Sequence, residues 1–195
     1  TPGGLTDWAL HPLLETAAGR KAEYPQAQVI GGRLAVAYID RDVSGSTAGE
    51  PAAPAFALAQ VDEPTGAADW LLYPLTAPAP LKTLPGFPQL SDRLCIAVGT
   101  GDRTAEGQSV HLYKANLQWP LAATDWTRVT VPIAGSNAWG YHCHLTLAGT
   151  RLLLSVGEQS IPNKIFVARA QVANPGGSAS DWLTEEVDAT WSEPT

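Results

Sequence analysis

The sequence predicts an all-β protein of β-propeller-type repeats, with three four-stranded antiparallel blades of about 56 to 62 residues plus one extra strand. The first observation is an Asp-Trp pair that occurs four times, with the tryptophans 62, 56 and 56 residues apart. The second is the composition, since 18 glycines and 16 prolines in 195 residues favour many turns over long helices. The pairs are Asp7-Trp8, Asp69-Trp70, Asp125-Trp126 and Asp181-Trp182.

Two further landmarks recur between the Asp-Trp pairs. An Arg-Leu pair opens an apolar run at Arg33, Arg93 and Arg151, which follow the preceding tryptophan by 25, 23 and 25 residues. An Ala-Gln-Val or Ala-Asn-Leu triplet then begins at residues 59, 115 and 170. Three landmarks in one fixed order, repeated three times, indicate a structural repeat and not chance.

Each unit contains four candidate strands. The first starts at the Asp-Trp pair, the second precedes Arg-Leu, the third is the Arg-Leu run, and the fourth ends at the Ala-Gln-Val triplet. Alternation in VHLYKANL is typical of a strand with one buried face, while the continuous apolar run RLLLSV is typical of a strand covered on both faces. The units span about 7–68, 69–124 and 125–180, with a partial fourth over 181–195, in a single domain over 1–195.

The repeat resembles a known type. VIGGRLAVAYID at 29–40 and ALAQVDEPTGAADW at 57–70 are similar to a bacterial extracellular β-propeller repeat, loosely like the sialidase-type (BNR-like) propellers. The resemblance implies a propeller and an extracellular or cell-envelope location. The sialidase Asp-box, Ser-x-Asp-x-Gly-x-Thr-Trp, does not occur in this sequence, which argues against transferring sialidase chemistry.

Charge and hydropathy exclude some partners. The net charge is −7 with only 16% charged residues, and Lys and Arg do not cluster, so we expect no nucleic-acid partner. No apolar stretch approaches the roughly 20 residues of a membrane span, so we expect no membrane insertion. Cys95 and Cys143 either form one disulfide or are two buried thiols.

The number of units suggests an open ring. Propellers normally have about four to eight blades, so three blades leave apolar faces at both ends. We therefore expect a non-catalytic interaction or assembly module, with a protein partner or self-association through its open blade edges. A carbohydrate-binding, lectin-like propeller is the first alternative, and a fragment of a sialidase-like glycoside hydrolase is the second.

The repeated residues have two interpretations. The Asp-Trp pairs and the three arginines recur in every unit, which favours a structural role with the tryptophans wedged between blades. A lectin would also repeat its site, because tryptophan faces stack on sugar rings, and a glycan is then the ligand.

One stretch is singular to a single repeat and is the predicted ligand-binding site. It contains Trp139, Tyr141, His142 and His144, and strand alternation puts the two histidines on one face. Two histidines so placed can bind one zinc ion, but no third ligand is near in the sequence, so we assign no metal.

Asp40 and Asp42 are weak metal candidates. Their spacing before Gly45 resembles the start of a calcium loop, but the twelfth position of such a loop is Pro51 and not an acidic residue. We expect no cofactor, and calcium is the one ion kept as a candidate. No catalytic residue is assigned, because the common catalytic motifs are absent, although Asp40, Asp42, Glu106 and Glu158 lie in corresponding loops.

Overall fold

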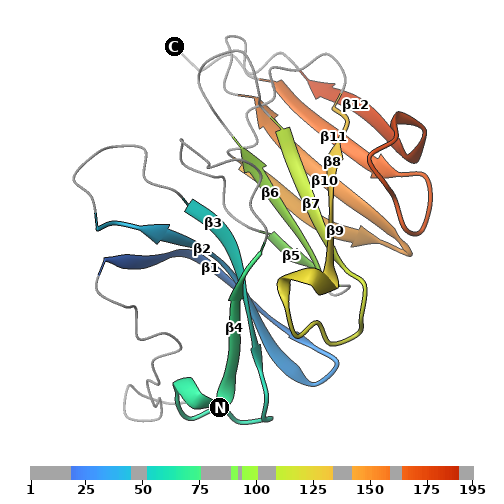
Figure 1. Cartoon of the computed structure of the whole chain (residues 1–195). Coiled ribbons are helices and arrows are strands. Elements are labelled where there is room, and N and C mark those ends of the chain that lie inside the picture. The colour runs from blue at the N-terminus through green and yellow to red at the C-terminus, as the bar shows by residue number, and fades with distance from the viewer. Residues whose placement is uncertain are drawn as a thin grey trace, which may run out of the picture.

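The computed structural model describes residues 19–44, 52–75, 89–91, 94–100, 109–133, 142–158 and 164–188. Over these ranges the chain forms three four-stranded antiparallel sheets, and within each sheet the strands pair in chain order (Figure 1). The predicted all-β, propeller-type architecture with three four-stranded blades is confirmed. No helix in the described part of the chain has the length and hydrophobicity needed to cross a bilayer.

The strands have 3 to 11 residues, and each sheet contains four of them. The first sheet contains β1 (Arg20–Ile30), β2 (Arg33–Asp42), β3 (Ala52–Ala59) and β4 (Trp70–Pro74). The second contains β5 (Gln89–Ser91), β6 (Cys95–Thr100), β7 (Ser109–Ala115) and β8 (Trp126–Val131). The third contains β9 (His142–Ala148), β10 (Arg151–Glu158), β11 (Lys164–Ala170) and β12 (Trp182–Asp188).

The position of the Asp-Trp strand within a sheet differs from the expectation. It is the fourth strand of its sheet and pairs with the strand before it, as Ala59 with Trp70, Ala115 with Trp126 and Ala170 with Trp182 show. The strand that begins at Trp182 is therefore the last strand of the third sheet and not an extra one. The pair Asp7-Trp8 lies outside the described residues, as does Arg93.

A repeated turn explains this placement. In each unit a 3₁₀ turn, Ala67–Asp69, Ala123–Asp125 or Ala179–Asp181, immediately precedes the tryptophan. The Asp125 carboxylate accepts hydrogen bonds from the backbone N–H of Leu121 (2.7 Å) and Ala122 (3.1 Å). Asp69 does the same for Thr65 and Gly66, and Asp181 for Gly176. The carboxylate closes a tight connection, so the next strand returns antiparallel beside the one before it.

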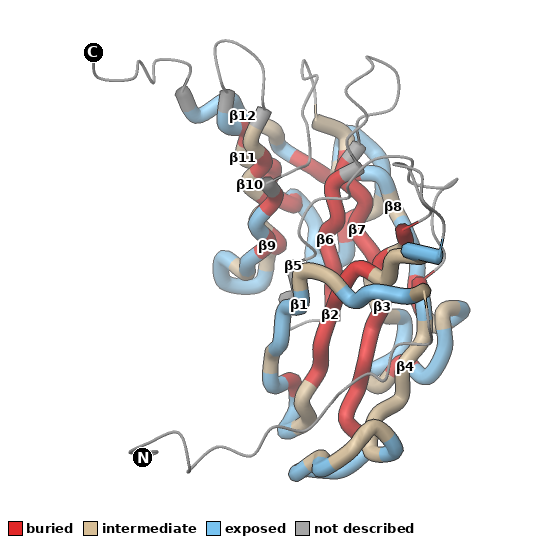
Figure 2. Tube along the Cα trace, turned by 90° about the vertical axis from the view of Figure 1, so that its left-hand side faces the viewer, coloured by how far each residue is buried: buried red, intermediate tan, exposed pale blue. Residues whose placement is uncertain are grey.

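The core consists of the layers between neighbouring sheets. Alternate residues of each sheet face opposite sides, so the middle strands are buried on both faces, as the red tubes of β2, β3, β6 and β7 show (Figure 2). One cluster joins sheets 1 and 2 through Ile39, Phe56, Ile96 and Tyr113. A second joins sheets 2 and 3 through residues such as Leu112 and Leu154.

Two of the repeated tryptophans fill these layers. Trp126 is 8% exposed, lies edge-on to Phe56 of the first sheet at 5.0 Å between ring centroids, and donates its indole N–H to the Tyr73 hydroxyl at 3.0 Å. Trp182 is buried in the layer between sheets 2 and 3 and donates to the Gly176 carbonyl at 2.8 Å. Trp70 is partly buried on the face of sheet 1 that points away from sheet 2.

A second contact joins the first two sheets at their hairpin end. Trp119 lies against Gly31, where an added Cβ would come within 2.7 Å of the indole, and Gly31 also has φ +55°. The Arg33 guanidinium stacks over the same indole at 4.9 Å. Glycine is required at position 31 by both the backbone conformation and the close approach of the ring.

Both cysteines are buried thiols and form no disulfide. They lie in the layer between sheets 2 and 3, and the Cys143 S–H points to the Ala97 carbonyl oxygen at 3.8 Å. Burial raises the pKa of the Cys143 thiol to about 12, so the thiol is protonated and unreactive at neutral pH.

We predict that Trp126→Ala lowers the free energy of unfolding by about 3–5 kcal/mol, because it removes a buried indole between two sheets. Urea unfolding followed by circular dichroism measures this change. Trp70→Ala is the matched control, and its partly buried side chain should cost less than half as much. Equal losses for the two variants would contradict the assignment of Trp126 as an inter-sheet wedge.

Candidate functional site

The first strands of the three sheets, β1, β5 and β9, lie next to one another, and the charged end of β1 is the candidate site. Pairing of β1 with β2 sets Arg20 opposite Asp42, Lys21 opposite Arg41 and Ala22 opposite Asp40. Because side chains alternate along both strands, these residues divide into two charged networks on opposite faces of the sheet.

The first network faces the second sheet and centres on Glu23. Its carboxylate accepts a hydrogen bond from Arg41 Nε at 2.8 Å and lies 3.0 Å from Lys21 Nζ. Only 12% of the Glu23 side chain and 13% of the Arg41 side chain are exposed. Arg41 Nη2 is buried and has no hydrogen-bond partner among the described residues.

The charge state of Glu23 follows from these neighbours. Burial by itself would raise the pKa of Glu23, but the hydrogen bonds and positive charges of Arg41 and Lys21 outweigh it and hold the pKa below its usual value. Glu23 is therefore an ionised carboxylate at neutral pH in a half-buried position. Such a group can accept hydrogen bonds or a proton, but it cannot serve as a general acid.

A β-bulge stands directly beside Glu23. The register of β1 on β2 shifts between Glu23 and Gln26, and Tyr24 has φ +55°. A left-handed backbone at a bulky residue before proline costs about 1–3 kcal/mol, and such strain concentrates at functional sites. Tyr24 packs onto the layer between sheets 1 and 2. The bulge therefore sets the direction of the side chains at this end of the strand.

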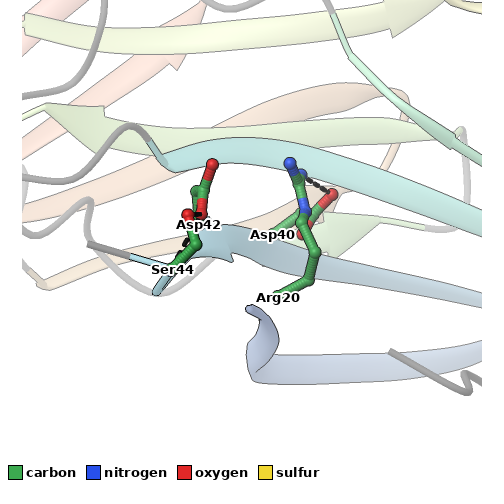
Figure 3. A network of polar contacts seen from close by, with 4 residues as sticks. All are labelled: Arg20, Asp40, Asp42 and Ser44. Carbon is green, nitrogen blue, oxygen red and sulfur yellow. Dashed lines mark hydrogen bonds and ion pairs between the residues drawn. The ribbon is translucent and has the colours of Figure 1, made fainter. Parts of the chain in front are cut away.

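The second network lies on the other face of the same strands (Figure 3). Arg20 donates from both Nε and Nη2 to the two oxygens of Asp40. This hydrogen bond raises the pKa of Arg20 further above its usual value. The Arg20 side chain is 41% exposed, so the guanidinium is also accessible to solvent.

Asp42 takes part in a local turn. Its Oδ1 accepts hydrogen bonds from the Ser44 hydroxyl at 2.6 Å and the Ser44 N–H at 3.0 Å, which lower the pKa of Asp42 (Figure 3). Tyr38 lies buried two residues before Asp40 on β2. Its burial, together with the charge of Asp40, raises the pKa of Tyr38 to about 12. The calcium site considered at Asp40 and Asp42 stays a prediction, and no group of three metal-ligating side chains occurs among the described residues.

The structure places the predicted ligand-binding residues only in part. Trp139 and Tyr141 lie outside the described residues. His142 and His144 lie on β9, where they pair with Gly157 and Ser155 of β10. The His144 side chain is exposed, and Cys143 between the two histidines is buried. The ligand-binding assignment of this stretch stays a prediction. Of the arginines in the repeat, Arg33 stacks on Trp119, and Arg151 opens β10.

Several residues of the site carry little or no signal in the sequence. Glu23 and Arg41 carry no motif, and their pairing depends on the register of two strands. The one available signal was Tyr24-Pro25 inside a strand, because proline within a strand marks a bulge or an edge. The buried His111 was also unassigned. Burial, together with the charge of Arg128, lowers its pKa to about 4, so it is neutral at physiological pH.

Comparisons with known proteins agree with the fold. No family model and no curated protein matches the sequence. Among solved structures, a family 117 glycoside hydrolase of the marine bacterium Zobellia galactanivorans is similar, with TM-score 0.50, 13% identity and 80% of this chain covered. Another structure, described as a glycoside hydrolase, gives TM-score 0.53 at 12% identity over 92% of this chain. The chain spans only 54% and 60% of those two proteins.

These neighbours correct the functional expectation. A non-catalytic interaction or assembly module is the preferred interpretation of the sequence, and it is wrong as the main one, because both of these structural neighbours are glycoside hydrolases. The alternative, a fragment related to glycoside hydrolases, is better supported. The resemblance to propellers holds at the level of the fold.

We predict that Arg41→Met lowers the free energy of unfolding at pH 7 by about 2–4 kcal/mol, because it leaves the half-buried Glu23 charge with Lys21 alone. The double variant Glu23→Gln/Arg41→Met is the control and should recover part of that loss. Urea unfolding of wild type and both variants measures the coupling between the two residues.

The same variants carry a pH signature. The folded pKa of Glu23 lies below its unfolded value, so its contribution is present above the unfolded value of about 4.5 and is lost as the pH falls through the folded pKa. The difference in the free energy of unfolding between wild type and Arg41→Met should therefore decrease on acidification below pH 4.5. A gap that stays constant from pH 7 to pH 3 would contradict the pairing.

Proposed function

We propose that this chain forms part of a glycoside-acting propeller, in which the charged end of β1 contacts a carbohydrate substrate. The observation that carries the proposal is Glu23, a carboxylate that is 12% exposed, paired with two cations and next to a strained bulge. Burying an ion and straining the backbone both cost stability, and a purely structural strand end needs neither.

The chemistry of the networks fits a sugar. Carboxylates and cationic side chains form charge-assisted hydrogen bonds with hydroxyl groups, and Glu23, Lys21 and Arg41 supply both kinds on one face of the strand pair. The depressed pKa of Glu23 suits a base, a nucleophile or an acceptor for a substrate hydroxyl. A glycosidase also needs a protonated acid, and Glu23 does not meet that need.

The fold likeness supports the same class. Two glycoside hydrolases share this propeller-type arrangement, and their greater length leaves room for further blades around a common axis. A sialidase-like substrate, a glycan as ligand and an extracellular or cell-envelope location belong to this proposal. Self-association through open blade edges is a separate prediction, and the native mass in solution tests it.

The direct test is glycoside turnover by the protein, with aryl-glycosides and a panel of neutral and acidic oligosaccharides as substrates. Glu23→Gln should lower kcat/KM by about 10²-fold or more, the usual contribution of a catalytic carboxylate. Asp62→Asn, an exposed carboxylate beyond the other end of sheet 1, is the control and should leave kcat/KM within about twofold. Absence of turnover and binding across the panel, or an unchanged Glu23→Gln enzyme, would refute the proposal.

A further inference from the structure

The two layers between sheets differ at one pair of corresponding positions. Trp119 and Pro175 each stand seven residues before the repeated tryptophan of their unit. At the boundary of sheets 1 and 2, the Trp119 ring packs onto the cluster that contains Leu58 and Leu94. At the boundary of sheets 2 and 3, the smaller Pro175 takes the place of that ring.

A second substitution occurs at the same place. Leu58, which is 1% exposed, immediately precedes the alanine that ends β3, and Lys114 precedes the alanine that ends β7. The boundary of sheets 2 and 3 therefore has lost an indole and gained an ammonium group relative to its counterpart. What replaces them is a cavity of about 340 Å³, hereafter the boundary cavity, lined by Cys95, Lys114, Ala115, Leu152, Ala173 and Pro175.

The cavity has a definite polarity. Lys114 Nζ donates to Asn174 Oδ1 at 2.9 Å and to the Pro175 carbonyl at 2.5 Å. These bonds hold the ammonium at the cavity and use two of its three N–H groups. Among the described residues that line the cavity, the others are apolar apart from Asn174 and the Cys95 thiol, and none of them is a carboxylate.

We propose that the boundary cavity binds a small planar aromatic carboxylate. The ring of the ligand occupies the space that corresponds to the Trp119 indole. The carboxylate of the ligand accepts a hydrogen bond from the remaining N–H of Lys114. The volume lies within the range of about 300–1,000 Å³ that is usual for small-molecule pockets. A sugar fits this lining less well, because none of the described residues that line the cavity has an aromatic face for stacking.

The site is separate from the carbohydrate site. Cys95 and Leu152 stand at the start of β6 and β10, whereas Asp40 and Arg41 stand at the end of the corresponding strand β2. The boundary cavity therefore opens at the opposite end of the sheets from Glu23. Its occupancy does not depend on glycoside chemistry, so either proposal can fail alone.

The test uses indole-3-acetate as the anionic probe and 3-methylindole as the neutral probe, with equilibrium dialysis against the 195-residue chain. Both should bind saturably at one site per chain. Lys114→Leu gives position 114 the residue type of position 58. It should weaken the binding of indole-3-acetate by about tenfold, the effect of losing one charge-assisted hydrogen bond. The binding of 3-methylindole should weaken by less than about twofold. Pro175→Trp should abolish binding of both probes.

Glu63→Trp is the matched control, since Glu63 is the exposed counterpart of Trp119 and Pro175 in the first unit. It adds the same side chain away from the cavity and should leave both affinities unchanged. If Pro175→Trp does not fold, Cys95→Met fills the cavity from its other wall, because Cys95 lines the cavity and faces the layer between sheets 2 and 3. No saturable binding to wild type, equal binding to the filled variants, or an anionic probe indifferent to Lys114→Leu would overturn the proposal.

Discussion

The structure depends on one repeated device, an aspartate carboxylate that ties down the turn in front of a tryptophan. The Asp125 carboxylate fixes the backbone of residues 121–122, and the chain then enters β8 with Trp126 directed at the first sheet. A small antiparallel sheet cannot bury both of its faces alone, so its stability comes from the layer that the tryptophan completes. The same turn makes the repeat visible in the sequence, because each unit requires both the aspartate that closes the turn and the tryptophan that follows it.

The fold was predictable because each landmark reports a local requirement. Arg-Leu runs and Ala-Gln-Val triplets mark strands, and their spacing indicates four strands per unit. The sequence could not show to which sheet the Asp-Trp strand belongs, because a strand between two others can pair with either. The hydrogen bond from Gln60 N to the Asp69 carbonyl decides it, since it continues the pairing of β3 with β4 across the turn.

The candidate site was largely hidden for a related reason. The spacing of Asp40 and Asp42 resembles a calcium loop in the sequence. In the structure Asp40 accepts a hydrogen bond from Arg20, and Asp42 accepts one from Ser44. Glu23 meets Arg41 only because strand register and the bulge at Tyr24 bring them together across two strands. A one-residue slip would place these side chains on opposite faces, so no local pattern encodes the pair. Neighbours at 12–13% identity support the fold and leave the residues of the site to be argued from their geometry.

The most direct measurement is an amide NMR titration of the protein with the oligosaccharide panel. A carbohydrate site at the charged end of β1 predicts that bound sugar shifts the resonances of residues 20–24 and 38–42, with smaller changes at the far hairpin around Gly31 and Gly32. Glu23→Gln should weaken the titration without altering the rest of the spectrum. Shifts centred elsewhere on the sheets, or no shifts with any sugar, would contradict a carbohydrate site at the charged end of β1.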